Sequence, residues 1–270
     1  MSSSRERNDR TRPPRGRPDK PFQPRRHARQ EGGSEWIWGW HAVVAALANP
    51  RREMPRRLVA TPDRARQLTE RFGPLDTLET FDSQAIAQLT PSGAVHQGVA
   101  LKTAPLEGVS IDELGEPAQG LLLMLDHVTD PQNVGAIFRS AAAFGAKGVI
   151  VQDRHAPPLT GALAKAAAGA VDAVPHARVV NLSRALERLS DLGWRAVGLD
   201  GEAKEPLEKV LDGGPTVLVL GSEGEGLRRL VAEHCDALGR IPMPGGFESL
   251  NVSAAAAVAL YEAARAASKG

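Results

Sequence analysis

The sequence predicts an α/β protein with two folded domains, the larger of them built on a parallel β-sheet. From Trp36 onward, apolar runs of strand length alternate with stretches of helical length, which is the pattern of α/β domains. The run Leu121–Leu125 is apolar at every position, as expected for a strand covered on both faces. Two later runs, Val217–Leu220 and Leu238–Ile241, each lead into a glycine-rich loop. We therefore expect a ligand site at one edge of that sheet.

Length and composition are those of a globular protein. The chain has 270 residues, of which 42% are hydrophobic and 24% charged, so one large or two ordinary domains can bury a core. It has neither an apolar run of about 18 residues nor an apolar segment behind its basic N-terminus, so no membrane span or secretory signal is predicted. We therefore expect a cytoplasmic protein. The single cysteine, Cys235, is expected to be an unreactive thiol, although His234 and Asp236 beside it invite a metal-site reading.

Residues 1–34 differ in charge from the rest of the chain. They carry nine Arg and one Lys against four acidic residues, a net charge of +6, whereas the remainder carries −5. A basic, proline-containing segment with few apolar residues cannot bury enough surface to fold, so a disordered arm is predicted. This charge favours a polyanionic partner, most simply RNA or DNA; a transit peptide or a solubilising tail is the alternative.

Residues 35–104 are predicted to form the smaller α/β domain. Asp63 is expected to cap the second of its helices. His41 and His96 are expected to have packing or surface roles, because neither has a Cys, Ser or carboxylate partner at motif spacing. The expected strands are 36–39, 58–60 and 99–102, and the expected helices are 41–48, 64–72 and 83–89.

Residues 105–118 are predicted to be a linker, because proline and glycine lie at both ends and apolar anchors are few. The larger domain is predicted over residues 119–270, with right-handed crossovers between parallel strands. Its expected strands are 121–125, 148–151, 171–174, 195–199, 217–220 and 238–241, and its expected helices are 133–144, 159–168, 182–189 and 252–267.

The glycine-rich loop 221–226 has the spacing GxxGxG, which differs from the dinucleotide-binding pattern. Glu223 and Glu225 lie where phosphates would bind, so a neutral or cationic ligand is favoured over a pyrophosphate. The alternative is a plain solvent-exposed turn. Ser249 or Asn251 is expected to cap the helix after the second glycine-rich loop. Two such loops side by side form a pocket lined by main chain, which suits a nucleoside-like ligand.

Asn133 and Arg139 are the polar side chains of chemical interest in the helix after the first strand of the larger domain. Gly135 and Ala136 lie between them and permit close approach. Arg139 is the only basic residue of an otherwise apolar helix. A surface role, an ion pair in a dimer interface and a phosphate-binding role all remain open for it.

Three motifs follow one another in the larger domain: DPQNVGAIFR at 130–139, LGSEGEGL at 220–227 and IPMPGGFESLNVS at 241–253. With these motifs the whole domain resembles the SpoU (TrmH) family of RNA ribose 2′-O-methyltransferases. The smaller domain, through WGWHAV at 38–43 and HQGV at 96–99, is similar to the ribosomal-protein-L30e-like substrate-binding domain of the RlmB branch. That branch methylates a guanosine of 23S ribosomal RNA.

The resemblance implies S-adenosylmethionine as cofactor, RNA as partner, a trefoil-knotted SPOUT catalytic domain and a homodimer. It implies no metal. The positions that match cofactor contacts, mostly through backbone, are Gly221, Ile241 and Leu250. The positions that match catalytic-site residues are Asn133, Arg139, Glu223, Ser249 and Asn251. After Lys165 the branch usually has a serine before Ala-Gly, whereas this chain has only alanines before Gly169, so a hydroxyl contact is not implied there.

Two other functions compete with this interpretation. A noncatalytic RNA-binding protein would keep the smaller domain beside a degenerate enzyme fold, but the five catalytic-site positions are intact. The same chemistry on transfer RNA is the second alternative, and the size of the smaller domain favours ribosomal RNA only by analogy.

The charge of residues 1–34 yields a first prediction. Deleting this segment should lower RNA affinity and flatten its dependence on salt without changing the methyl-transfer step, because fewer phosphate counterions are released on binding. Filter binding of full-length and truncated protein across a salt series measures both quantities. An unchanged salt slope in the truncated protein contradicts the prediction.

Overall fold

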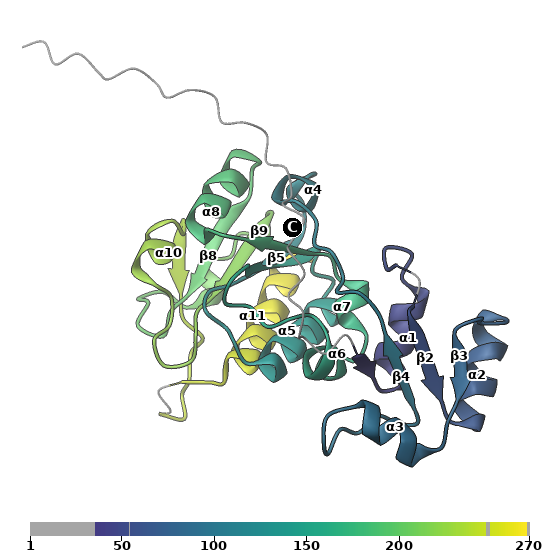
Figure 1. Ribbon diagram of the computed structural model, residues 1–270. Coiled ribbons are helices and arrows are strands. Elements are labelled where there is room, and N and C mark those ends of the chain that lie inside the picture. The colour runs from purple at the N-terminus through teal and green to yellow at the C-terminus, as the bar shows by residue number, and fades with distance from the viewer. Residues whose placement is uncertain (1–35, 54, 247–248, 269–270) are drawn as a thin grey trace, which may run out of the picture. The chain divides into compact units, whose positions relative to one another are not determined.

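The computed structural model describes residues 36–53, 55–246 and 249–268. These residues form two β-sheets with helices packed against them (Figure 1). The predicted arm at 1–34 lies outside the described residues. Among the helices of the described part, none combines the length and the apolar character needed to cross a membrane.

The first sheet has four strands: β1 (Trp36–Trp38), β2 (Arg57–Ala60), β3 (Leu78–Thr80) and β4 (Val99–Lys102). Their order is β1-β4-β2-β3, with β4 antiparallel to both β1 and β2, and β3 parallel to β2. The sequence did not predict β3, which is only three residues long and largely exposed. The helices beside this sheet are α1 (Trp40–Ala48), α2 (Pro62–Phe72) and α3 (Ser83–Leu89).

Helix α2 begins earlier than predicted. Thr61 is its N-cap residue and Pro62 occupies the first turn, so the expected cap at Asp63 is wrong. Proline suits the first helical position because its fixed φ is already helical and its missing N–H is not needed there. Asp63 lies in the first turn instead, where a carboxylate is still favourable beside the positive end of the helix.

The second sheet is six-stranded and entirely parallel, as predicted, in the order β10-β8-β9-β5-β6-β7. The continuous apolar run Leu121–Leu125 forms β5 near its centre and is buried at every residue. The other strands are β6 (Gly148–Gln152), β7 (His176–Val179), β8 (Arg195–Leu199), β9 (Thr216–Leu220) and β10 (Ala237–Gly239).

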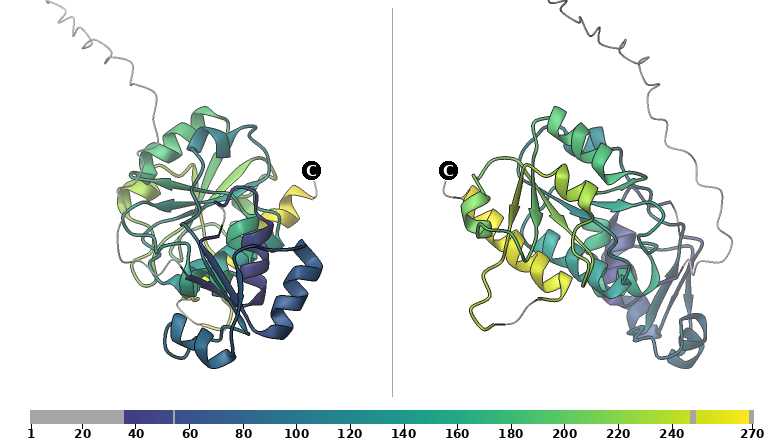
Figure 2. Two further views of the ribbon diagram at one scale, coloured as in Figure 1. Left: turned by 45° about the vertical axis from the view of Figure 1, so that its right-hand side comes forward. Right: turned by 90° about the vertical axis from the view of Figure 1, so that its left-hand side faces the viewer.

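Helices cover both faces of the second sheet (Figures 1 and 2). One face carries α4 (Ile111–Gly115), α8 (Leu182–Asp191) and α10 (Arg229–Glu233). The other carries α5 (Pro131–Ala143), α6 (Gly161–Ala167), α7 (Ala170–Ala173), α9 (Leu207–Val210) and α11 (Val252–Ala267).

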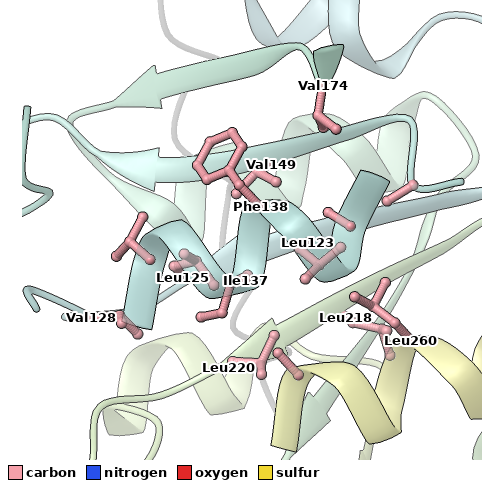
Figure 3. Close-up of a cluster of buried hydrophobic side chains, with 14 of the residues drawn as sticks. Leu123, Leu125, Val128, Ile137, Phe138, Val149, Val174, Leu218, Leu220 and Leu260 are labelled. Carbon is pink, nitrogen blue, oxygen red and sulfur yellow. The ribbon is translucent and has the colours of Figure 1, made fainter. Parts of the chain in front are cut away.

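The core on the second of these faces holds α5 and α11 against the sheet (Figure 3). Ile137 and Phe138 of α5 and Leu260 of α11 are fully buried there. Burying each such side chain contributes about 1.5–3 kcal/mol. Gly135 lets α6 approach α5 closely, because a Cβ at this position would lie 2.6 Å from the Leu163 carbonyl oxygen. The buried side chains and the close approach at Gly135 together fix the position of α5.

The predicted strand at 171–174 is wrong, and this segment is helix α7. Val171 is buried within this helix, and Val174, also buried, is its C-cap residue with an extended backbone. Gly169 with φ 97° separates α6 from α7. The strand β7 starts only after Pro175, whose carbonyl accepts a hydrogen bond from Val149 N at 3.0 Å.

The segment predicted as a linker, 105–118, contains α4. Ser110 caps this helix, and Leu114 is buried in the core beneath α8. Trp194 Nε1 donates to the Gly115 carbonyl at 2.7 Å. This part of the segment therefore packs with the second sheet, while the domain boundaries themselves stay a prediction.

A buried polar cluster links the chain after α1 to α7. Arg52 Nε and Nη2 donate to the two Asp172 oxygens at 2.5 and 3.1 Å, and Asn49 Nδ2 donates to Asp172 Oδ1 at 3.0 Å. Arg52 Nη1 also donates to the Ala104 carbonyl at 3.2 Å. Both charged side chains are only 3% exposed. Such a pair needs these additional hydrogen bonds to offset the cost of removing two charges from water.

Replacing Asp172 by alanine should destabilise the protein strongly, because Arg52 would remain buried without its counter-charge. The free energy of unfolding is expected to fall by about 3–5 kcal/mol. The exposed pair Arg57–Glu79 provides the control, with side chains 36% and 46% exposed. Glu79→Ala should cost far less, because water screens an exposed ion pair. Urea denaturation of both variants measures the difference, and equal losses would contradict the prediction.

Candidate active site

Three segments far apart in the sequence meet at the carboxyl edge of the second sheet. Strands β5 and β9 are neighbours, with Leu125 opposite Leu220, so the chain segments that follow them emerge together. Asn133 lies in the first turn of α5, Glu223 in the loop after β9, and Asn251 at the start of α11.

Glu223 joins these segments through one carboxylate oxygen. Its Oε1 accepts from Asn133 Nδ2 at 3.0 Å, from Asn251 Nδ2 at 2.7 Å and from Val252 N at 3.2 Å. Asn251 Nδ2 also donates to Asn133 Oδ1 at 3.0 Å. Hydrogen bonds to an ionised acceptor are roughly twice as strong as neutral ones. The three side chains therefore form one connected group, here called the Glu223 network.

Helix capping fixes how the Asn251 amide is turned. Its Oδ1 accepts from Ser253 N at 2.9 Å and from Ala254 N at 3.4 Å, which makes it the N-cap of α11. Because the oxygen is committed to the helix, the Nδ2 group faces Glu223. The positive end of the 16-residue helix also favours the Glu223 carboxylate. The sequence left the cap open between Ser249 and Asn251, and the structure assigns it to Asn251.

The N-terminus of α5 is fixed in a similar way. Asp130 accepts from Gln132 N at 3.1 Å and from Asn133 N at 3.3 Å, so the helix begins at Pro131, two residues before the predicted start. Asn133 thereby stands in the first turn, with its backbone held and its side chain directed to Glu223.

The loop that carries Glu223 is closed at its base by Asp126. Asp126 N donates to the Leu220 carbonyl at 2.8 Å, before the loop. Its fully buried carboxylate accepts from Arg228 N at 3.0 Å and Nε at 2.7 Å, after the loop. Sequence reasoning did not identify Asp126 or Arg228. A carboxylate directly after a fully buried strand was nevertheless a feature that could have indicated Asp126.

Closing the loop after β9 in this way also requires a glycine at position 221. Ser222 and Gly226 exchange two backbone hydrogen bonds across the loop, at 3.2 and 3.0 Å. A Cβ at Gly221 would lie 2.0 Å from the Gly226 carbonyl carbon, which no real contact permits. Any side chain at this position must therefore open the loop.

Two predicted catalytic residues lie outside the Glu223 network. Arg139 is exposed on α5 and makes no hydrogen bond or ion pair with the residues that the structure describes. Ser249 is likewise exposed, directly after Phe247 and Glu248, which lie outside the described residues. The structure thus brings together three of the five predicted side chains, Asn133, Glu223 and Asn251.

The predicted cofactor positions lie on two loops at the carboxyl edge of the sheet. Gly221 follows β9 directly. Ile241 follows β10 and is partly buried against the core. Leu250, just before α11, is 42% exposed and offers an apolar surface.

The other polar side chains near this edge of the sheet are less suited to a catalytic role. A hollow of about 640 Å³ lies beyond β8 and β10, and its walls include Asp200, Glu202, Glu205, Glu233 and Asp236. Such a negative wall disfavours a polyanion. Burial raises the pKa of Cys235, also in this wall, to about 12, so its thiol stays protonated. Within the described ranges, no three His, Cys, Asp or Glu side chains are grouped to hold a metal ion.

Two family models match the chain and together cover both sheets. Residues 120–261 match the SpoU rRNA methylase family, and residues 36–109 match the RNA 2′-O ribose methyltransferase substrate-binding domain.

Curated relatives agree with these matches. An uncharacterized tRNA/rRNA methyltransferase of Mycolicibacterium vanbaalenii is 44% identical over 64% of this chain, and the match spans 57% of that relative's length. The 23S rRNA (guanosine-2′-O-)-methyltransferase RlmB of Pseudomonas syringae pv. tomato is 46% identical over 86% of this chain and 95% of its own length.

Solved structures show the same fold. The SpoU methyltransferase AviRb of Streptomyces viridochromogenes has a TM-score of 0.74 at 25% identity, covering 87% of this chain and 90% of its own. An AdoMet-bound rRNA methyltransferase of Sinorhizobium meliloti has a TM-score of 0.71 at 26% identity, covering 85% and 86%. With the family model matched from β5 into α11 and the motif residues Asn133, Glu223 and Asn251 joined at one sheet edge, the chain belongs to the SpoU rRNA methylase family.

Proposed function

We propose that this protein transfers a methyl group from S-adenosylmethionine to a ribose 2′-hydroxyl of RNA. The Glu223 network carries the proposal, because it assembles residues from all three family motifs into one group. A degenerate, noncatalytic RNA-binding protein has no need to keep this group intact.

The target that the relatives favour is a guanosine of 23S ribosomal RNA. The RlmB relative of Pseudomonas syringae, named for this reaction, aligns over most of both chains. Transfer RNA is the second candidate, since the name of the Mycolicibacterium relative includes both RNA classes. Both targets share the same reacting hydroxyl, so only an RNA comparison separates them.

The residues present fit S-adenosylmethionine. The loop at Gly221 offers main chain without side-chain obstruction, and Leu250 offers an exposed apolar surface for an adenosine. Glu223 and Glu225 suit a cationic sulfonium, where a pyrophosphate would be repelled. When bound, the cofactor supplies a methyl group activated by its positively charged sulfur. Gly221, Ile241 and Leu250 would hold it, mostly through backbone.

Each catalytic position has a distinct task in this proposal. The Glu223 carboxylate orients the amides of Asn133 and Asn251, which then hold the ribose. Arg139 is a poor base because a guanidinium is not deprotonated in proteins, so it binds the adjacent phosphate and stabilises the alkoxide that forms as the hydroxyl loses its proton. The proton passes to phosphate or water. Ser249 completes the pocket beside Leu250.

The domain assignments extend this proposal. Residues 35–104 form an L30e-like domain that binds the RNA substrate, supported by the family model over 36–109. Residues 105–118 connect it to the catalytic domain at 119–270, and the basic arm at 1–34 adds RNA affinity. A trefoil knot is proposed for the catalytic domain, supported by the return of the chain from β10 to α11, which packs against α5 and β9. The protein acts in the cytoplasm, where its RNA substrate is assembled.

A homodimer is proposed through the exposed sides of α5 and α11. The two helices lie side by side, since Asn133 bonds Asn251 at one end and the Phe144 and Tyr261 rings lie 6.1 Å apart at the other. Val258 and Tyr261 are 39% and 53% exposed on α11. Arg139 is exposed in the middle of α5, one of the two helices proposed to form this surface. A partner seated there lies beside the proposed phosphate contact.

The test of the activity is methylation of defined RNA. Unmodified 23S ribosomal RNA transcript and total transfer RNA, each incubated with labelled methyl donor, should show label in the ribosomal RNA at a 2′-O-methylated guanosine. Label in transfer RNA alone selects the second candidate. No label in either RNA rejects the proposed chemistry.

Two variants in the same assay separate cofactor binding from methyl transfer. Arg139→Ala should bind cofactor nearly as the wild type does and transfer methyl about a hundredfold to a thousandfold more slowly, because one preorganised electrostatic contact is lost. Gly221→Val should abolish cofactor binding, because its side chain opens the loop. Calorimetry and single-turnover kinetics measure the two effects. Near-normal transfer by a dimeric Arg139→Ala protein rejects the phosphate-binding role.

The dimer surface can be tested with one charge. Tyr261→Glu places a carboxylate in the proposed interface and should convert the dimer to a monomer in sedimentation experiments. Leu230→Glu is the matched control, because Leu230 is 56% exposed but lies on α10, across the sheet. Dissociation by the control, or a Tyr261→Glu protein that stays dimeric, contradicts the proposed surface.

A further inference from the structure

Two histidines meet at the carboxyl edge of the second sheet, the edge that also carries the Glu223 network. Strands β5 and β6 are neighbours in register, with Leu125 opposite Val151, so the segments that follow them emerge side by side. His127 lies in the first segment and His155 in the second, with their ring centroids 4.4 Å apart. Strand β5 lies between β6 and β9, so the ring pair stands at the same edge of the sheet as the proposed reaction centre.

The local structure around His127 is energetically unfavourable in two respects. His127 has φ 56°, a left-handed conformation that is unfavourable for a residue with a side chain. Its Nε2 atom is buried and has no hydrogen-bond partner among the described residues, and the same is true of Gln152 Oε1 in the hollow beneath the pair. Strained backbone and unsatisfied buried polar atoms concentrate at functional sites.

The residues on the outer side of this pair are exposed to solvent, and hydrogen bonds hold the loop that carries them. His155 and its neighbour Arg154 are both exposed, and Arg154 makes no hydrogen bond or ion pair with the described part of the chain. Their loop is held from below by Arg178, which donates to the Pro157 carbonyl at 2.8 Å and to the Asp153 carbonyl at 3.5 Å. Asp153 N also donates to the Val179 carbonyl at 2.9 Å. A guanidinium and a ring are thus presented to solvent on a fixed loop.

We propose that Arg154 and His155 form a subsite for an unpaired nucleotide of the RNA, next to the ribose that is methylated. His155, backed by His127, stacks on the base, and Arg154 contacts the phosphate. Unpaired RNA bases are commonly bound by stacking on aromatic or histidine rings, while arginine binds phosphate. The subsite rests on the RNA methyl transfer proposed above. It gives a task to exposed groups that the methyl-transfer step does not use.

The stacking role is tested by steady-state methylation of unmodified 23S ribosomal RNA transcript with two variants of His155. His155→Ala should raise KM for the RNA about fivefold to a hundredfold, the range expected for the loss of one stacked base. His155→Phe should restore most of the loss, because it keeps a ring. Cofactor affinity, measured by calorimetry, should stay unchanged in both.

The arginine is tested through the salt dependence of binding to the same transcript. Arg154→Ala should reduce the slope of log affinity against log salt by about 1, as for the loss of one phosphate contact. Arg184→Ala is the matched control, an exposed arginine on α8 across the sheet, and should leave the slope and KM unchanged.

The outcomes separate the subsite from the proposed function. A His155→Ala protein with wild-type KM, or a His155→Phe protein as impaired as His155→Ala, overturns the stacking role. An Arg154→Ala slope equal to that of the wild type overturns the phosphate contact. If the wild-type protein methylates no RNA, the proposed function fails instead, and filter binding of the same variants to the transcript still decides the subsite.

Discussion

The buried carboxylate of Asp126 is the constraint on which the rest of the site depends. It links the end of β5 to both ends of the loop after β9, through Leu220 and Arg228. The carboxylate is fully buried, so the hydrogen bonds from Arg228 are what keeps its charge tolerable. Once the base of the loop is closed, Ser222 and Gly226 can pair across it, and Glu223 reaches the amides of two helices. A structural ion pair thereby sets the position of the Glu223 network.

Much of the fold could be predicted from local patterns. The continuous apolar run at 121–125 correctly indicated a strand buried on both faces, and the strands at 99–102 and 195–199 were predicted with the bounds observed. The prediction was wrong at 171–174, where residues 171–173 lie in helix α7, because a short apolar run does not by itself distinguish a strand from a buried helical turn. Helix α4 was missed because its single buried leucine gives no periodicity over five residues. Short elements whose form is decided by tertiary packing cannot be read from the chain alone.

The site was less accessible to sequence reasoning than the fold. Spacing alone pointed to a glycine loop with two acids, and it was the family resemblance that named Asn133, Glu223 and Asn251 together. Their contact joins positions 90 and 118 residues apart from Asn133, which no periodicity encodes. The same limit hid Asp126 and Arg228, which are 102 residues apart. His127 and His155 became connected only when the neighbouring strands β5 and β6 were seen to bring their loops together.

Helix α11 determines when the site can be completed during synthesis of the chain. Asn251 caps this helix with one atom of its amide and reaches Glu223 with the other, so the last helix of the described chain and the Glu223 network are completed by the same residue. During synthesis, Asn133 is made 118 residues before Asn251, and Glu223 is made 28 residues before it. The Glu223 network therefore cannot be complete until Asn251 has been made, and fragments that end before α11 lack it even where their sheet has formed.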